Sequence, residues 1–294
     1  MKFLKLSITA LMVIMTSSCF GQNWSDVEIK TIQLSDHVYM LTGAGGNIGV
    51  SVGDDGVFVI DDQFAPLSAK IITAIKDLSD RPIHFLVNTH WHGDHTGGNA
   101  NMSKEGVTIV AHDHVRKRLK ETPKRDGSAR ETEALPVITY NDELNFFMNG
   151  ERVAVFHVSN AHTDGDSVIF FTESNVLHTG DTYFNGRYPY IDIGSGGSVD
   201  GYISAVESSL KLIDDETKII PGHGGVSNKS EFMAFLEMMK SLRIAVLSEI
   251  EKGKTEEEVA ANTKITKAYD DLGYSWNFIS SEKIRRAYYK SLKK

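Results

Sequence analysis

Residues 88–99 read Asn-Thr-His-Trp-His-Gly-Asp-His-Thr-Gly-Gly-Asn. Three histidines, His90, His92 and His95, together with Asp94, therefore fall within six residues. Imidazole nitrogens and carboxylate oxygens are ligands that zinc and similar ions prefer. Because the chain has only 11 histidines in 294 positions, this cluster is improbable as a chance polar loop. We therefore predict a metal site at this stretch.

The spacing within the cluster indicates ligands for two neighbouring ions. The first two histidines are two residues apart, so along an extended stretch they can share one face. Gly93 then allows a turn that aims Asp94 and His95 in another direction. One short loop can therefore supply ligands to two ions.

Short apolar runs and helical patterns alternate around the cluster. Residues 38–42, 48–52 and 57–60 predict an antiparallel meander, and residues 83–88 predict a buried strand that delivers the histidines at its C-terminal end. Further strands are predicted at residues 107–111, 152–158, 167–171, 176–178 and 218–220. Helices are predicted at residues 67–78, 115–121, 198–212, 229–251 and 281–292, with a capping box at 255–258 opening another. Two β-rich halves with helices outside them predict an α/β fold, a four-layer αββα sandwich in one domain.

The first 21 residues have the pattern of a bacterial signal peptide. Lys2 and Lys5 precede an apolar run at residues 6–15, which is too short to span a bilayer comfortably. Two cleavage sites are open: one after Gly21, leaving residues 22–294, and one before Cys19, which would then carry a lipid anchor. An uncleaved membrane anchor is a third alternative. In each case the catalytic part is expected outside the cytoplasm, in the periplasm or secreted.

Cysteine content and charge limit the chemistry. Cys19 is the only cysteine, so the processed domain has no disulfide and no thiolate metal ligand. Without residues 1–21 the chain has 29 basic and 39 acidic residues, a formal charge of −10. An acidic surface repels a phosphate backbone. We therefore expect a small-molecule substrate and no nucleic acid.

The stretch at residues 88–99 resembles the signature of the metallo-β-lactamase superfamily. Three further segments resemble the rest of that pattern in the same order: residues 161–166 (Ala-His-Thr-Asp-Gly-Asp), 178–181 (His-Thr-Gly-Asp) and 221–224 (Pro-Gly-His-Gly). The resemblance covers essentially the whole processed chain. It implies an αββα sandwich with a metal site along one edge.

The resemblance also implies a ligand set for two zinc ions, although other divalent metals would suit the same residues. One ion would be held by three histidines: His90, His92 and His162. The other would be held by an aspartate and two histidines: Asp94, His95 and His223. Asp181 would bridge the two ions.

Asp181 is also the point at which the chain departs from the best-known β-lactamases of this family, many of which have a cysteine there. An aspartate at this position is similar to glyoxalase II, the lactonases and ribonuclease Z. The substrate therefore stays open among a β-lactam, a lactone or ester, and a thioester of the glyoxalase II type. An iron-dependent sulfur dioxygenase of the same fold is a further alternative.

The expected reaction is hydrolysis of a carbonyl substrate. Two neighbouring ions lower the pKa of a bridging water towards neutrality, so that a metal-bridging hydroxide can attack the carbonyl carbon. Asp94 is the predicted catalytic residue, because it would also orient this nucleophile.

Substrate contacts are predicted in the aromatic segment at residues 182–190, which directly follows the bridging position. Asn185, Arg187 and Tyr188 are the candidate residues, with Arg187 suited to bind a carboxylate. The alternative is that the aromatic side chains only pack the loop.

A second His-x-His pair, His112 and His114, is interpreted as surface or supporting residues, with Asp113 capping a helix. Residues 274–276 are expected to pack on the domain or to form an interface.

Overall fold

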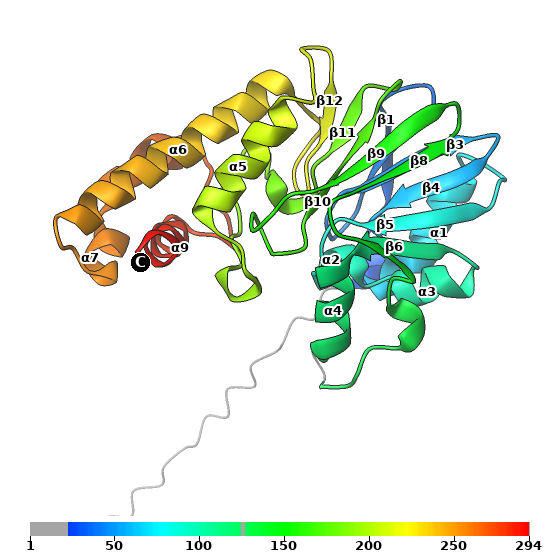
Figure 1. Cartoon of the computed structure of the whole chain (residues 1–294), viewed down its shortest axis with the longest axis horizontal. Helices are drawn as coiled ribbons and strands as arrows, with labels where there is room; N and C mark the ends of the chain where they lie inside the picture. The colour runs from blue at the N-terminus through cyan, green and yellow to red at the C-terminus, as the bar shows by residue number, and fades with distance from the viewer. Residues whose placement is uncertain (1–22, 125–126, 294) are drawn as a thin grey trace, which may run out of the picture.

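Two β-sheets packed face to face form the centre of the computed structural model, which describes residues 23–124 and 127–293 (Figure 1). Helices cover the outer face of each sheet, so the predicted four-layer αββα sandwich is confirmed. The predicted signal peptide and Cys19 lie outside the described residues.

The first sheet has seven strands whose order in space is their order in the chain. Strands β1 to β4 pair antiparallel, and β4 to β7 pair parallel. Their bounds are β1 (Lys30–Gln33), β2 (Val38–Thr42), β3 (Ile48–Gly53), β4 (Gly56–Ile60), β5 (Ile83–Asn88), β6 (Thr108–His112) and β7 (Ile138–Tyr140).

The second sheet has six strands in the order β13-β12-β11-β10-β9-β8. All neighbours pair antiparallel except β11 and β12, which are parallel. Their bounds are β8 (Glu143–Met148), β9 (Glu151–His157), β10 (Ser167–Phe171), β11 (Val176–His178), β12 (Lys218–Ile220) and β13 (Ser227–Asn228).

Apolar side chains of both sheets interdigitate in the layer between them. Phe58 of β4 is fully buried there, with its ring centroid 5.0 Å from that of Phe146 and 6.1 Å from that of Phe171. Burying such rings is among the largest stabilising contributions in a core. One inter-sheet core therefore joins the two β-rich halves of the sequence.

The helices form the two outer layers. Helices α1 (Ser68–Lys76) and α3 (Asn99–Lys104) lie on the first sheet, where Ile71, Ile75 and Met102 are buried. Helices α5 (Val199–Leu210) and α6 (Lys229–Glu251) lie beside the second sheet in Figure 1, and α9 (Ser281–Leu292) packs against α6 farther from the sheet. The remaining helices are α2 (Gly93–Thr96), α4 (Asp113–Glu121), α7 (Glu256–Ala261) and α8 (Lys267–Asp270).

The predicted capping box at the start of α7 is confirmed. The side chain of Thr255 accepts a hydrogen bond from the backbone N–H of Glu258.

Within residues 23–124 and 127–293, none of the helices has the length and apolar character needed to cross a membrane.

Four strands were not predicted: β1, β7, β8 and β13. These four are the edge strands of the two sheets. An edge strand pairs on one side only and often carries exposed side chains, which weakens the apolar pattern. All four residues of β1 are exposed, and Phe147 of β8 is 77% exposed. The central strands, by contrast, lie within a residue or two of their predicted positions.

Candidate metal centre

The loops that follow β5, β9, β11 and β12 bring the predicted metal ligands together. The first four ligands come from the loop after β5 and from α2, which begins at Gly93. His162 lies between β9 and β10, Asp181 follows β11, and His223 follows β12. Strand ends thus place side chains from distant parts of the chain at one site, as the sequence predicted.

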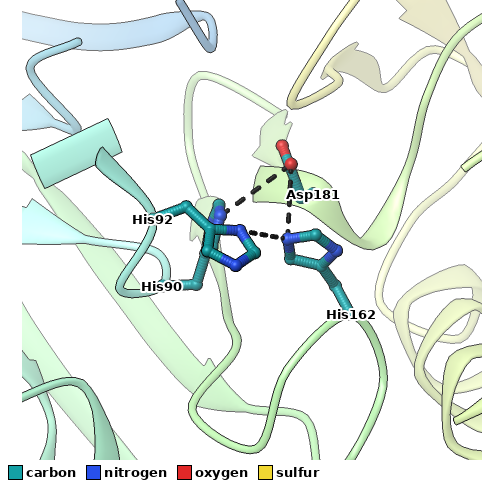
Figure 2. Close-up of side chains that lie close together, drawn as sticks. All are labelled: His90, His92, His162 and Asp181. Atoms are coloured by element: carbon teal, nitrogen blue, oxygen red, sulfur yellow. Dashed lines mark hydrogen bonds and ion pairs between the residues drawn. The ribbon is translucent and has the colours of Figure 1, made fainter. Parts of the chain in front are cut away.

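His90, His92, His162 and Asp181 form the first ligand group, with one ligand atom of each lying within 4.8 Å of the others. Figure 2 shows the three imidazole rings and the carboxylate pointing toward one another. His162 Nε2 lies 2.8 Å from His92 Nδ1, and Asp181 Oδ2 lies 3.5 Å from His162 Nε2 and 3.8 Å from His90 Nε2.

Asp94, His95 and His223 form the second ligand group, whose ligand atoms also lie within 4.8 Å of one another. Asp94 Oδ2 lies 3.4 Å from His223 Nε2 and 3.7 Å from His95 Nε2. The other oxygen of Asp181, Oδ1, lies 3.1 Å from His95 Nε2 and 3.4 Å from His223 Nε2. The two carboxylate oxygens of Asp181 therefore face one group each, which is the arrangement expected of a bridging ligand.

Three buried atoms at this site lack a hydrogen bond: His90 Nε2, His95 Nε2 and Asp181 Oδ1. A buried polar atom without a partner is costly, so each such atom needs an explanation. One cation bound within each group would satisfy all three atoms. The donor set contains imidazole nitrogens and carboxylate oxygens and fits a dinuclear site for ions of the zinc type.

The ring nitrogens that face away from the cluster are held by neighbouring oxygens. Asp61 Oδ2 lies 2.7 Å from His95 Nδ1, and Asp192 Oδ2 lies 3.0 Å from His92 Nε2. His162 Nδ1 lies 2.7 Å from the carbonyl oxygen of Tyr190. Such partners fix the tautomer and orientation of a ligating imidazole. Asp192 was not predicted, because it belongs to no recognisable motif and is 100 residues from His92.

Burial and charge separate the protonation states of the ligands. Burial lowers the pKa of His162 to about 4, so this ring is neutral at pH 7. Burial opposes protonation of His223, but the nearby Asp181 carboxylate raises the pKa of His223 to about 9. Burial would raise the pKa of Asp94, yet the adjacent His95 and His223 lower it to about 2. Asp94 is therefore an anionic ligand at neutral pH.

A cavity of about 760 Å³ opens onto the ligands His92, Asp94, Asp181 and His223. This volume lies within the usual range for small-molecule sites. Most of the remaining lining is glycine or aromatic: Gly43, Gly45, Gly93, Phe64, Trp91, Phe184, Tyr190, Trp276 and Phe278. The arrangement suits a compact, partly apolar substrate held next to the metal centre.

The three predicted substrate contacts lie in different environments. Arg187 lines the cavity. Asn185 does not, because its amide donates to the carbonyl of Gly225 and its oxygen accepts from Tyr183. The prediction for Tyr188 is corrected: its ring is fully buried, and its hydroxyl donates to Asp270 Oδ1 at 2.7 Å.

The second His-x-His pair lies outside both ligand groups, and His112 is buried rather than at the surface. The ring of His112 stacks on that of His157 at a centroid distance of 3.8 Å. His112, rather than the predicted Asp113, caps α4, because its Nδ1 accepts from the backbone N–H of His114. An imidazole nitrogen here takes the role usually filled by a short oxygen-bearing side chain.

We expect His112 to make stability depend on pH. Burial lowers the pKa of His112 to about 4, whereas an unfolded histidine has a pKa of about 6.5. The neutral ring is thus favoured in the folded state, and stability is lost as pH falls from about 6.5 towards 4, by up to about 2 kcal/mol at pH 5. Replacing His112 with glutamine should remove this part of the loss.

Urea denaturation of the chelator-treated protein at pH 7 and pH 5 measures the effect. His84→Gln is the control, because His84 is exposed on β5. The free energy difference between the two pH values should shrink in His112→Gln and stay unchanged in His84→Gln. An equal pH dependence in both variants would contradict the assignment.

Residues 41–223 match the family model described as the metallo-beta-lactamase superfamily. A hydroxyacylglutathione hydrolase of Pelagibacter ubique is 28% identical over 57% of this chain and 62% of its own length. The 2,4-dinitroanisole O-demethylase subunit alpha of a Nocardioides species is 25% identical over 84% of this chain and 73% of its own length. Among solved structures, a metallo-beta-lactamase from Pontibacter korlensis superimposes with a TM-score of 0.62 at 17% identity, covering 72% of this chain and 99% of that one.

Proposed function

The chain belongs to the metallo-beta-lactamase superfamily and is a metal-dependent hydrolase, and we propose that it uses two zinc ions to cleave a carbonyl substrate outside the cytoplasm. One observation carries this proposal. Asp181 presents one oxygen to each ligand group, so the described residues supply complete ligand sets for two ions. Zinc is proposed because imidazole nitrogens and carboxylate oxygens are among its usual ligands.

When bound at these ligands, two ions would supply Lewis acidity and a water whose pKa is close to neutrality. The residues of the chain supply the rest. Asp94 lines the cavity as an anion and can accept a hydrogen bond from the attacking water, which orients it toward the substrate. The aromatic lining around the ligands would shield a bound substrate from part of the solvent, which would strengthen electrostatic interactions inside the cavity.

The position of Arg187 supports an acidic substrate. Its guanidinium lies in the lining of the cavity, and a guanidinium binds carboxylates with two parallel hydrogen bonds. A β-lactam, a lactone or ester, and a thioester all remain candidates. The name of the Pelagibacter relative supports the thioester alternative, and the name of the Nocardioides relative is compatible with an aromatic substrate.

Export is part of the proposal and rests on the basic and apolar pattern of residues 1–21. Fractionation of an expressing bacterium, followed by mass spectrometry of the isolated protein, tests it. A mass corresponding to a chain that begins at Gln22 supports cleavage by an ordinary signal peptidase. A lipid attached to Cys19 supports the anchored alternative, and an intact cytoplasmic chain would overturn export.

Hydrolysis assays test the activity. The zinc-loaded protein is given a chromogenic cephalosporin, an acyl-homoserine lactone and S-lactoylglutathione in parallel, each with and without a chelator. Chelator-sensitive turnover of any one of them at ordinary enzyme efficiency, a kcat/KM of about 10⁴ M⁻¹s⁻¹ or more, supports the proposal and selects the substrate type. Turnover that survives removal of the metal would contradict it.

A further inference from the structure

The segment between α8 and α9 contributes to the cavity above the metal ligands, although it lies beyond residues 41–223 that match the family model. Trp276 and Phe278 of this segment line the same cavity as Asp94 and His223. The ring centroid of Trp276 lies 6.3 Å from that of His223. The C-terminal part of the chain thus forms one side of the site, which we call the C-terminal wall (residues 274–278).

Hydrogen bonds to Tyr188 fix the C-terminal wall in place. Trp276 Nε1 donates to the carbonyl oxygen of Tyr188 at 3.0 Å, and the backbone N–H of Tyr188 donates to the carbonyl of Tyr274 at 2.9 Å. The Tyr188 hydroxyl donates to Asp270, which also accepts from Ser281 Oγ at 2.6 Å. The wall is therefore a pre-formed surface rather than a loose terminal segment.

The wall continues an aromatic surface that begins beside the metal ligands. The Phe184 ring stacks on His223 with centroids 5.0 Å apart, and Trp276 lies 6.1 Å from Phe184. Phe278 lies 5.6 Å from Trp276 and 5.2 Å from Tyr190. Phe278 is 51% exposed, so it stands at the rim of the cavity. Such a row of ring faces and edges favours a planar apolar group.

Arg187 lies on this surface with its guanidinium carbon 5.2 Å from the centre of the Trp276 ring. Within residues 23–124 and 127–293, its side chain makes no ion pair or hydrogen bond. Arg118, by contrast, forms a two-pronged pair with Asp164 at 2.6 and 2.7 Å. The Arg187 guanidinium is half-buried in the cavity, stacked on an aromatic ring and unpaired among the described residues. It is therefore available to bind an anionic group of a substrate.

We propose that the C-terminal wall selects substrates that carry a planar aromatic group and an acidic group, the first packed on Trp276 and the second paired with Arg187. This inference builds on the proposed hydrolase, because it defines the substrate class of the same cavity. It is nevertheless a statement about binding. Its test can therefore succeed or fail independently of hydrolysis.

Isothermal titration calorimetry of the zinc-loaded full chain tests the inference with three probes. 1-Naphthylacetate is planar and acidic, cyclohexylacetate is acidic but not planar, and 1-naphthaleneethanol is planar but neutral. We expect 1-naphthylacetate to bind at least about fivefold more tightly than either of the others. Trp276→Leu should remove the preference for the planar acid over cyclohexylacetate, and Arg187→Gln should remove the preference for the acid over the alcohol.

Matched controls are available on other surfaces. Phe147→Leu changes a 77% exposed aromatic side chain on β8, and Arg243→Gln changes an arginine paired with Asp200. Neither should alter the three dissociation constants. Trp276→Phe should retain the planar preference, and unchanged thermal unfolding of the variants confirms that they fold.

Two results would overturn the inference. The first is equal binding of the three probes by the wild-type protein. The second is 1-naphthylacetate binding that survives Arg187→Gln but disappears when the zinc is removed, because the carboxylate would then bind the ions and not the arginine. Selective binding together with hydrolysis that survives removal of the metal would instead overturn the proposed function and leave the inference standing.

Discussion

Replacing Asp181 with asparagine is expected to lower hydrolytic activity at least about a hundredfold, equivalent to about 2.7 kcal/mol, and to lower the bound zinc from two ions per chain to one or fewer. The two oxygens of Asp181 face different ligand groups. An asparagine side chain has one oxygen and one NH₂ group, and the NH₂ group cannot bind a cation. One group must therefore lose its bridging ligand, and the negative charge between the two groups is lost as well.

Zinc content by mass spectrometry and turnover of whichever substrate is cleaved measure the two parts of this prediction. Asp54→Asn is the matched control, because the Asp54 side chain is fully exposed and belongs to neither ligand group. The control should keep two ions and full turnover. Two tightly bound ions in Asp181→Asn, with activity within threefold of the wild type, would show that Asp181 is not a bridging ligand.

The central part of the fold could be predicted because buried strands and outer helices leave strong apolar patterns. Strands such as β4 are buried along their whole length, so each residue contributes to the signal. Edge strands such as β1 are exposed on both faces, and their pairing is decided by a neighbouring strand and not by their own composition. The edges of both sheets were missed for this reason.

The metal ligands were predictable to different degrees. The cluster at residues 88–99 is contiguous and needed only ligand chemistry to be recognised. His162, Asp181 and His223 are isolated polar residues, and only their order in a family pattern identified them. Asp192 has neither advantage, because its contact with His92 exists only after the chain has folded.

The cavity lining was the least predictable part. Aromatic residues occur both in cores and in binding sites, so the sequence alone could not show which side chains of residues 182–190 face the cavity. The structure separates them: Tyr188 is buried behind the loop and holds it to Asp270, whereas Arg187 faces the cavity. Trp276 was expected to pack on the domain or at an interface, and it does donate to Tyr188 while also lining the site.

Replacing Asp94 with asparagine should lower kcat about a hundredfold or more while leaving the fold unchanged. General acid–base and orienting groups typically contribute factors of about 10² to 10⁴. Asp94 is anionic because its pKa is lowered to about 2 by His95 and His223, despite burial that would raise it. Asparagine keeps the shape but loses the charge. Its side chain is 29% exposed at the cavity, so the substitution opens no hole in the core.

Asp94 has two proposed roles: it holds the second ion, and it orients the attacking water. Measuring the turnover of Asp94→Asn at increasing zinc concentrations distinguishes these roles. If Asp94 only held the ion, raising zinc until both sites are full would restore the turnover of Asp94→Asn to the wild-type rate. If it also orients the nucleophile, turnover stays low at saturating zinc, because an amide is a weaker acceptor than a carboxylate. We expect the second outcome, since the Asp94 carboxylate reaches His223 Nε2 at 3.4 Å and lines the cavity at the same time. Full recovery at saturating zinc would reduce Asp94 to a metal ligand alone.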